Sequence, residues 1–350
     1  MKKSLLHNIK AILTIILMGI SSSACAQIVD VKGVDLRFEA RGEYDYQSVD
    51  GEKVVPETGF KGRLVNIFLQ GDIGHGFSYK YRQRLNEIHK DKSFFDSTDW
   101  LYLQWDVNPK LSFMFGKWVV LTGGWEFDPA PIDVFQLGEF SSMFPCYQWG
   151  ANVVLNVNPG HDKLILQVTQ SPFRDDWKLR SGKDEDTYGY NLMWYGNHGW
   201  YHSAWSVNMM EYEPGKYINY LFLGNRIKPS DELEFDFDIM NRAVKGQTFL
   251  FKDVSLSGIA KWQPMKQLKV YAKANYDVNR SGKEADYCLH DGTEITRVGG
   301  GVEYFPLGNE KVRFHANYNY SFGKNSNCNG ALKDKQHKVE IGATWKMQVL

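Results

Sequence analysis

Apolar and polar residues alternate along most of this chain with a period of two, which is the pattern of a β-strand with one apolar and one polar face. In the segment 311–322, the apolar residues Val312 and Phe314 alternate with Arg313 and His315. The segment 232–239 repeats this pattern, with acids at every polar position. Such segments predict strands that place one face against water and the other against an apolar medium.

Segments of this kind follow one another to the end of the chain, and they predict an all-β fold of about sixteen strands, with bounds good to a few residues. The predicted strands cover 34–46, 62–73, 77–86, 99–107, 111–120, 147–157, 163–170, 187–196, 200–210, 217–226, 232–242, 253–263, 267–278, 294–305, 311–322 and 337–349.

Short turns and longer polar loops alternate between these strands. The turns contain Gly or Pro, as in Gly74-His75-Gly76 and Asn158-Pro159-Gly160. The loops lie around 47–61, 87–98, 121–146, 171–186, 211–216, 243–252, 279–293 and 323–336. Turns on one side and loops on the other are typical of antiparallel outer-membrane barrels, with turns in the periplasm and loops outside the cell.

A soluble β-sandwich or lipocalin-like barrel is the alternative, because it too alternates apolar and polar faces. About sixteen strands closed into one barrel leave a lumen too wide for side chains to fill, so the polar face has to meet water inside and the apolar face has to meet lipid outside. Tryptophans near strand ends favour the membrane barrel, because interfacial girdles place aromatic residues there. They are Trp100, Trp118, Trp149, Trp194, Trp200, Trp205 and Trp262.

The first 26 residues have the features of a cleavable signal peptide. Lysines precede an apolar run from Ala11 to Ile20, and Ala24-Cys25-Ala26 follows it. The run is about 10 residues long, whereas a membrane-spanning helix needs roughly 20, so an N-terminal anchor is the weaker alternative. A lipid attached to Cys25 is another, but Ser22 stands where lipoprotein signals carry a large aliphatic residue. We expect cleavage near Ala26, a single barrel domain over 27–350 and localisation in the outer membrane.

Charge and cysteine content exclude several classes of function. Removing residues 1–26 leaves 38 Lys and Arg against 41 Asp and Glu, a net charge of −3 that disfavours nucleic acid as a partner. After the signal, no apolar stretch approaches membrane-helix length. Cys146, Cys288 and Cys328 have no metal-ligand spacing, so we predict no metal site and no cofactor. Pairing of Cys288 with Cys328 stays open.

Three blocks of sequence resemble the phosphate-selective porin O and P family, in the versions found in Bacteroidetes outer membranes. The first runs from Phe60 to Ile67, through Gln70-Gly71-Asp72-Ile73, to Phe77-Ser78-Tyr79-Lys80-Tyr81-Arg82. The second pairs Trp100-Leu101-Tyr102-Leu103 with Phe115-Gly116-Lys117. The third contains Pro131-Ile132-Asp133-Val134-Phe135, Tyr147-Gln148-Trp149-Gly150 and Ser171-Pro172-Phe173. The resemblance spans roughly residues 34–350.

This resemblance implies a trimeric channel of sixteen strands, with a lumen lined by basic residues that select phosphate. Alternation puts Lys80, Arg82 and Arg84 on one inward face, about 7 Å apart along the strand. Because like charges that close repel, we expect partners, which are loop carboxylates, permeant anions, or wall acids such as Asp72 or Asp106. Further inward candidates are Arg37, Arg41, Lys269, Lys273, Arg297 and Arg313, against the acids Asp35, Glu39, Glu43, Asp45, Glu234, Asp236 and Asp238. A wall that carries both signs does not commit the pore to anions.

The third loop, 121–146, carries more aromatic residues than an exposed loop usually does. We expect it to fold inward and to project Glu126, Asp128, Asp133 and Glu139 opposite the basic row. The alternative is a loop that closes over the mouth or packs on a neighbouring subunit.

Together these patterns predict an outer-membrane porin, a passive channel for small hydrophilic solutes or ions, with anions such as phosphate among the candidates. Outer-membrane lipid and two further copies of the chain, as a homotrimer, are the expected partners. The sequence lacks a GxSxG elbow and an HExxH helix, so we predict no enzymatic activity. A plugged surface receptor or adhesin barrel, and less so a barrel hydrolase, remain the alternatives.

Overall fold

The computed structural model describes residues 33–88, 93–247 and 251–350. The predicted signal peptide, 1–26, lies outside these residues.

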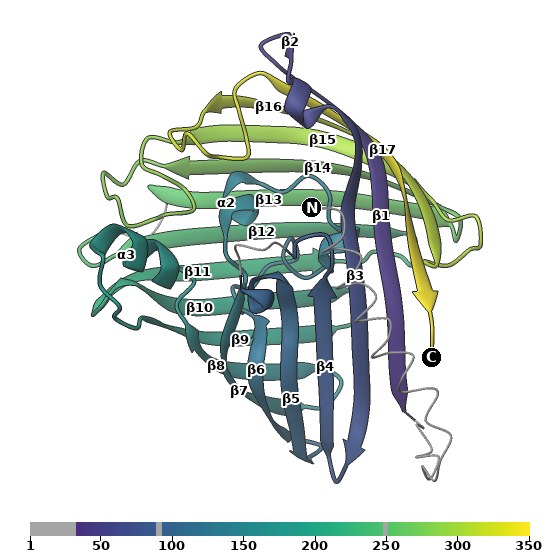
Figure 1. Ribbon diagram of the computed structural model, residues 1–350, viewed down its shortest axis with the longest axis vertical. Helices are drawn as coiled ribbons and strands as arrows, with labels where there is room; N and C mark the ends of the chain where they lie inside the picture. Colours follow the sequence, from purple (N-terminus) through teal and green to yellow (C-terminus); the bar gives the residue numbers. More distant parts are fainter. Residues whose placement is uncertain (1–32, 89–92, 248–250) are drawn as a thin grey trace, which may run out of the picture. The chain divides into compact units, whose positions relative to one another are not determined.

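The strands form one antiparallel sheet that closes on itself, because β17 pairs with β1. Figure 1 shows this sheet with β1, β3 and β17 beside one another. The strands are β1 (Val34–Val49), β2 (Glu52–Lys53), β3 (Gly59–Gly74), β4 (Phe77–Arg84), β5 (Thr98–Asn108), β6 (Leu111–Val119), β7 (Tyr147–Asn158), β8 (Asp162–Gln170), β9 (Tyr188–His198), β10 (Tyr201–Glu213), β11 (Lys216–Ile227), β12 (Leu233–Val244), β13 (Asp253–Met265), β14 (Leu268–Asn279), β15 (Glu294–Tyr304), β16 (Val312–Lys324) and β17 (Gln336–Gln348).

The predicted strand number is confirmed, because β2 has two residues and the described chain otherwise forms sixteen long strands. The predicted loop 211–216 is wrong. β10 continues to Glu213 and β11 begins at Lys216, so Pro214 and Gly215 alone connect them, with Gly215 at a φ of 72° that favours glycine. Glu211 and Glu213 have the polar character of a loop, but both pair across the ladder, with Tyr217 and Lys216.

The two faces of the sheet differ in exposure as the alternation predicts. On β16, Phe314 and Tyr318 are about half exposed on the outer face, whereas Arg313, His315 and Asn317 are almost fully buried on the inner face. The same order holds on β12, where Phe235 and Phe237 are exposed and Asp236 and Asp238 are buried. A barrel with apolar residues outside and polar residues inside is stable only when its outer face meets lipid.

Two of the tryptophans predicted for the girdle lie inside the barrel instead. Trp100 and Trp118 pack against an inner apolar cluster that includes Tyr102, Met114 and Met193. Trp194, Trp200 and Trp262 are on the outer face or at strand ends, as expected. Their place in the alternation accounts for this, because Trp100 and Trp118 occupy inward positions of their strands.

The connections contain short helices: η1 (Val55–Glu57), η2 (Phe94–Ser97), η3 (Pro131–Asp133), α2 (Glu139–Met143) and α3 (Arg174–Ser181). Figure 1 shows α3 beside β10, and the two elements are in contact. Among the described residues, no helix is both long and apolar enough to cross a membrane.

Cys146, Cys288 and Cys328 are free thiols, and Cys288 is buried while Cys328 is exposed, so the structure does not pair them.

Two neighbouring residues on β5 test the assignment of faces. Leu103 is exposed on the outer face, and Gln104 is on the inner face. We predict that Leu103→Arg lowers the free energy of unfolding in lipid vesicles by about 2–4 kcal/mol, because it puts a charge in the apolar band. Gln104→Arg, the matched control, is expected to fold almost like the unaltered protein. Urea titration of refolded protein measures both, and equal losses would contradict the assignment.

Candidate functional site

The predicted basic row lies on the inner face of β4, but its arginines have a wall partner. Arg82 Nε and Arg84 Nε donate to the same Asp99 oxygen over 2.9 and 3.0 Å. The ladder between β4 and β5 shifts register here, because Arg82 pairs with Trp100 and Gln83 with Thr98. This bulge leaves Asp99 unpaired in the ladder and turns its carboxylate inward. The shared partner is therefore a wall acid, but neither Asp72 nor Asp106, and Arg84 also pairs with Glu87 of the following loop over 3.0 Å.

Packing also fixes Arg82, which is 2% exposed. Its guanidinium lies 3.8 Å from the Trp100 ring centre, and its Nη2 donates to Tyr147 Oη over 2.7 Å. Lys80 differs, because it lines a cavity and forms no ion pair with the part of the chain that the structure describes. Of the three residues, Lys80 is the one that offers an uncompensated cation.

The loop between β6 and β7, residues 121–146, binds inward side chains of the opposite wall through its carbonyl groups. Arg41 donates to Ile132 O over 3.2 Å and to Val134 O over 2.9 Å. Arg313 donates to Ile132 O over 2.9 Å. Further along, Arg297 donates to Leu137 O over 2.6 Å. Three arginines predicted as pore-lining cations thus hold loop carbonyls.

Wall carboxylates bind the N–H groups of the same loop. Asp238 on β12 accepts from Trp125 N and Glu126 N over 2.9 and 2.8 Å. Asp277 on β14 accepts from Glu139 N over 2.8 Å. Buried peptide groups need such partners, since an unpaired one costs about 1–3 kcal/mol.

Three of the four predicted loop acids have partners on β14 to β17 and their connections. Glu126 pairs with Lys273 over 2.5 Å and accepts from Asn275 over 2.8 Å and from the Ser141 hydroxyl. Burial opposes the charge, but Lys273 and these hydrogen bonds outweigh it and lower the pKa of Glu126.

Asp133 and Glu139 lie on the same side of the barrel as Glu126. Asp133 pairs with Arg313 and with Lys346, each over 3.0 Å. Glu139 accepts from Leu332 N over 2.8 Å. The expectation that the acids face the basic row of β4 is therefore wrong for Glu126, Asp133 and Glu139.

Asp128 is the fourth acid, and it forms no hydrogen bond or ion pair with the described residues. It is exposed to the lumen, although the surrounding wall partly desolvates its carboxyl and raises its pKa, an effect that Arg226 opposes. Asp128 lines two cavities, so it is a charge that solutes in either can meet.

Apolar contacts anchor the two ends of the loop. Phe140 and Phe144 pack against Tyr220 on β11, with ring centres 5.8 and 6.3 Å away. Leu121 and Trp125 belong to the inner apolar cluster with Met193 and other inward residues. Sequence reasoning missed this contact surface. It could have been found from the apolar residues that stand at inward positions of the strands, where polar residues are expected, among them Met193, Tyr220, Phe222 and Met240.

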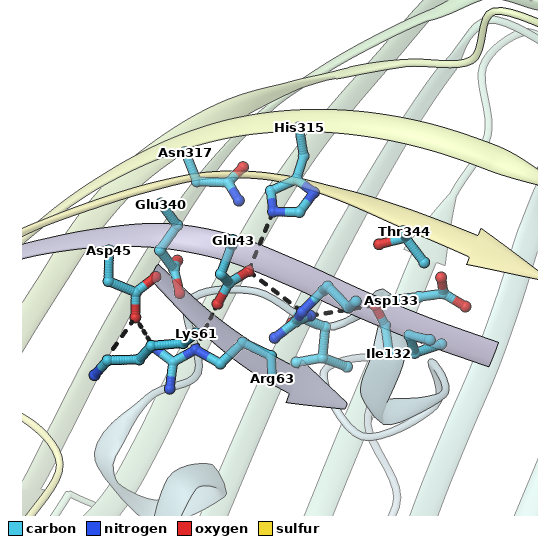
Figure 2. Close-up of polar contacts among 12 residues, drawn as sticks. Glu43, Asp45, Lys61, Arg63, Ile132, Asp133, His315, Asn317, Glu340 and Thr344 are labelled. Atoms are coloured by element: carbon cyan, nitrogen blue, oxygen red, sulfur yellow. Dashed lines mark hydrogen bonds and ion pairs between the residues drawn. The ribbon is translucent and has the colours of Figure 1, made fainter. Parts of the chain in front are cut away.

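Figure 2 shows the polar network where β1, β3, β16 and β17 meet the loop. Glu43 contacts His315 Nε2 over 3.2 Å and Arg63 Nε over 2.5 Å, and Arg63 also binds Asp45. The ring of His315 stacks on Phe135 of the loop, 4.7 Å between ring centres. The network thus connects β1, β3 and β16 by ion pairs and hydrogen bonds, and the His315 ring connects it to the loop.

Carboxylate oxygens of Glu43, Asp45 and Glu340 lie within 4.8 Å of one another, close enough to share a metal ion. Four cations already neutralise them: Arg41, Lys61, Arg63 and Lys338. A divalent cation would have to displace these groups, so the charge balance disfavours a metal here. The absence of a cofactor stays a prediction.

Two cavities lie along the inner face. One, of about 460 Å³, is lined by charged residues of β11 to β16, such as Arg226, Lys261 and Glu303. The other, of about 1150 Å³, is lined by β4 to β9 and includes Lys80, Trp118 and Tyr195. The loop segment 128–130 borders both.

Comparison with solved structures shows the fold. OmpT of Vibrio cholerae aligns over 90% of this chain and 97% of its own at 13% identity and a TM-score of 0.60. The anion-selective porin from Comamonas acidovorans aligns over 90% and 99% at 10% identity and a TM-score of 0.62. The outer-membrane channel DcaP of Acinetobacter baumannii aligns over 90% and 97% at 10% identity and a TM-score of 0.61. Comparison with curated protein sequences finds no match.

The sequence itself matches the family model of phosphate-selective porins O and P over residues 36–213. The match covers the basic row, the loop 121–146 and β1 to β10, whereas the predicted Bacteroidetes type stays a prediction. Since it spans half of the chain and agrees with the closed sixteen-stranded barrel, this chain belongs to the phosphate-selective porin O and P family.

Proposed function

We propose that the chain is a passive, non-enzymatic channel through the outer membrane for small hydrophilic solutes, and that the loop 121–146 narrows it. Membership of a porin family supports the channel. The observation that carries the proposal is the pair of cavities on the inner face, both of which the loop segment 128–130 lines. Solutes crossing the barrel would pass Asp128 on this segment.

The arginines of the wall are paired, and this argues against a row of free arginines that would bind phosphate as it crosses the channel. Arg41, Arg297 and Arg313 bind loop carbonyls, and Arg82 and Arg84 share Asp99. Among the described residues, the charges that line the larger cavity without an ion partner include Lys80, Lys163 and Asp128, so both signs are present. Anions such as phosphate would pass, but selectivity would depend on unpaired groups of this kind.

We further propose that the chain assembles as a homotrimer after its signal peptide is cleaved near Ala26. One of the similar solved structures, OmpT of Vibrio cholerae, is described in a trimer form. Mass measurement in mild detergent tests the trimer, and N-terminal sequencing of the exported protein tests the cleavage site.

Single-channel recording in planar bilayers tests the channel itself. We expect steady ohmic steps in potassium chloride. A plugged receptor or adhesin barrel would give no steady current, and this outcome would replace the channel proposal with that alternative.

Lys80 and Arg82 provide a matched pair for selectivity. We predict that Lys80→Ala shifts the reversal potential in a salt gradient toward cation preference. One unpaired charge within about 4 Å of the ion path contributes about 1 kcal/mol in water, a change of about fivefold in local ion concentration. Arg82→Ala is expected to leave selectivity almost unchanged and to destabilise the barrel, because it removes one of the two arginines that neutralise the buried Asp99 carboxylate. If Arg82→Ala changed the reversal potential and Lys80→Ala did not, the arginines would face the permeating ions.

Asp128 predicts a pH dependence of selectivity. Its pKa is raised, so the carboxyl binds a proton at a higher pH than an ordinary aspartate does. As pH falls through this pKa, the pore loses a negative charge, and the reversal potential should move toward anion preference. Asp128→Asn should abolish this step in a pH series of reversal potentials. A step that persists in Asp128→Asn would assign it to another group.

Arg297 tests how the loop is held. Arg297→Met removes the hydrogen bond to Leu137 O and offers no other donor. We predict that the free energy that holds the loop against the wall falls by about 1–3 kcal/mol, and that the open-channel current becomes noisier. Arg180→Met, an exposed arginine on α3, is the control. Equal noise in both variants would contradict the anchoring role.

A further inference from the structure

The larger cavity differs in chemistry from the rest of the inner face. Most inward positions carry charged or amide groups, but this chamber is walled by the inner apolar cluster and by the aromatic residues packed on it. Trp118 and Tyr195 are only partly buried there, so their rings reach the chamber. The rings of Trp118 and Tyr102 contact edge to face, 4.5 Å between centres, which fixes the Trp118 ring.

The polar groups of this chamber are mostly neutral. They include the amides of Gln104, Asn152 and Asn156 and the hydroxyl of Ser112. Its charged groups are two of each sign, Lys80 and Lys163 against Asp106 and Asp128, so they cancel. The smaller cavity is different, because ionised side chains dominate its lining.

Apolar ring faces beside neutral hydrogen-bonding groups suit one class of solute. A sugar ring has an apolar face of C–H groups that can stack on an aromatic side chain, and hydroxyls that can bind amides and hydroxyls. A small inorganic anion gains nothing from an aromatic wall and meets no net positive charge here. We propose that this chamber is a binding site for short, neutral carbohydrates that cross the channel, an inference that rests on the proposed channel function.

Size and access agree with this occupant. The chamber, of about 1150 Å³, exceeds the roughly 300–1,000 Å³ of pockets that hold drug-sized ligands, so a disaccharide fits with some of its water. Asn108 and Lys163, which also line it, are exposed next to the turns of the barrel, so the chamber opens at that end.

The test is current recording through single channels with maltose as the probe. We expect maltose to reduce the open-channel current with a saturating concentration dependence, which a polyethylene glycol of the same size does not show. In Trp118→Leu/Tyr195→Leu, the half-saturating concentration should rise about tenfold, because two aromatic contacts of about 0.5–1.5 kcal/mol each are lost while the cluster stays apolar. Trp262→Leu/Tyr304→Leu removes the same residue types from the outer face and should change nothing.

A reduction of current that does not saturate, or that is equal in both double variants, would overturn the proposal, as would saturable block by inorganic phosphate but not by maltose. Binding is also measured without conduction, from tryptophan fluorescence of the purified protein in a detergent that contains no sugar. If the protein conducts no current but maltose changes its fluorescence in a saturable way, the channel is refuted and the binding site is supported. If the protein conducts current but neither method shows a saturable effect of maltose, the binding site alone is refuted.

Discussion

Peptide groups of the loop 121–146 have to find partners inside the barrel, and this requirement determines how the inner wall is used. A loop exposed to water leaves such groups to solvent, but Glu126, Ile132 and Glu139 lie among buried side chains. Arginines of the wall bind the carbonyls, and aspartates of the wall bind the N–H groups. The arginine bonds join a charged side chain to a peptide group, and charge-assisted hydrogen bonds of this kind are stronger than neutral ones.

This arrangement explains why a wall rich in arginine does not present a row of free cations. All of the side chains that the family resemblance assigns to anion selection, apart from Lys80, pair with the loop or with wall acids. What remains for solutes is a small set of unpaired groups, among them Lys80, Lys163 and Asp128, and the aromatic chamber that they line. Selectivity would then come from a few positions, while the other charges stabilise the position of the loop.

The strands could be predicted from sequence because a period of two is a local property, and the lipid and the lumen enforce it on every strand. The bulge at Asp99 could not, since one extra residue changes the face of a side chain without changing the pattern around it. Trp100 and Trp118 lie inside the barrel because their place in the alternation, and not their residue type, decides which face they occupy. Partners of the loop acids lie far away in sequence, as Glu126 and Lys273 do, and no local pattern relates them.

The most direct test of the central claim, that the loop narrows the pore, is chemical labelling of its segment 128–130. Cys146 and Cys328, the described thiols that are not buried, are first replaced by Ser so that Ala130→Cys supplies the accessible one. A charged methanethiosulfonate reagent is then added during single-channel recording. The account predicts a stepwise, lasting fall in conductance on labelling, with none in the Cys146→Ser/Cys328→Ser background. Complete labelling of Ala130→Cys, verified by mass spectrometry, with unchanged conductance would show that this segment does not border the ion path.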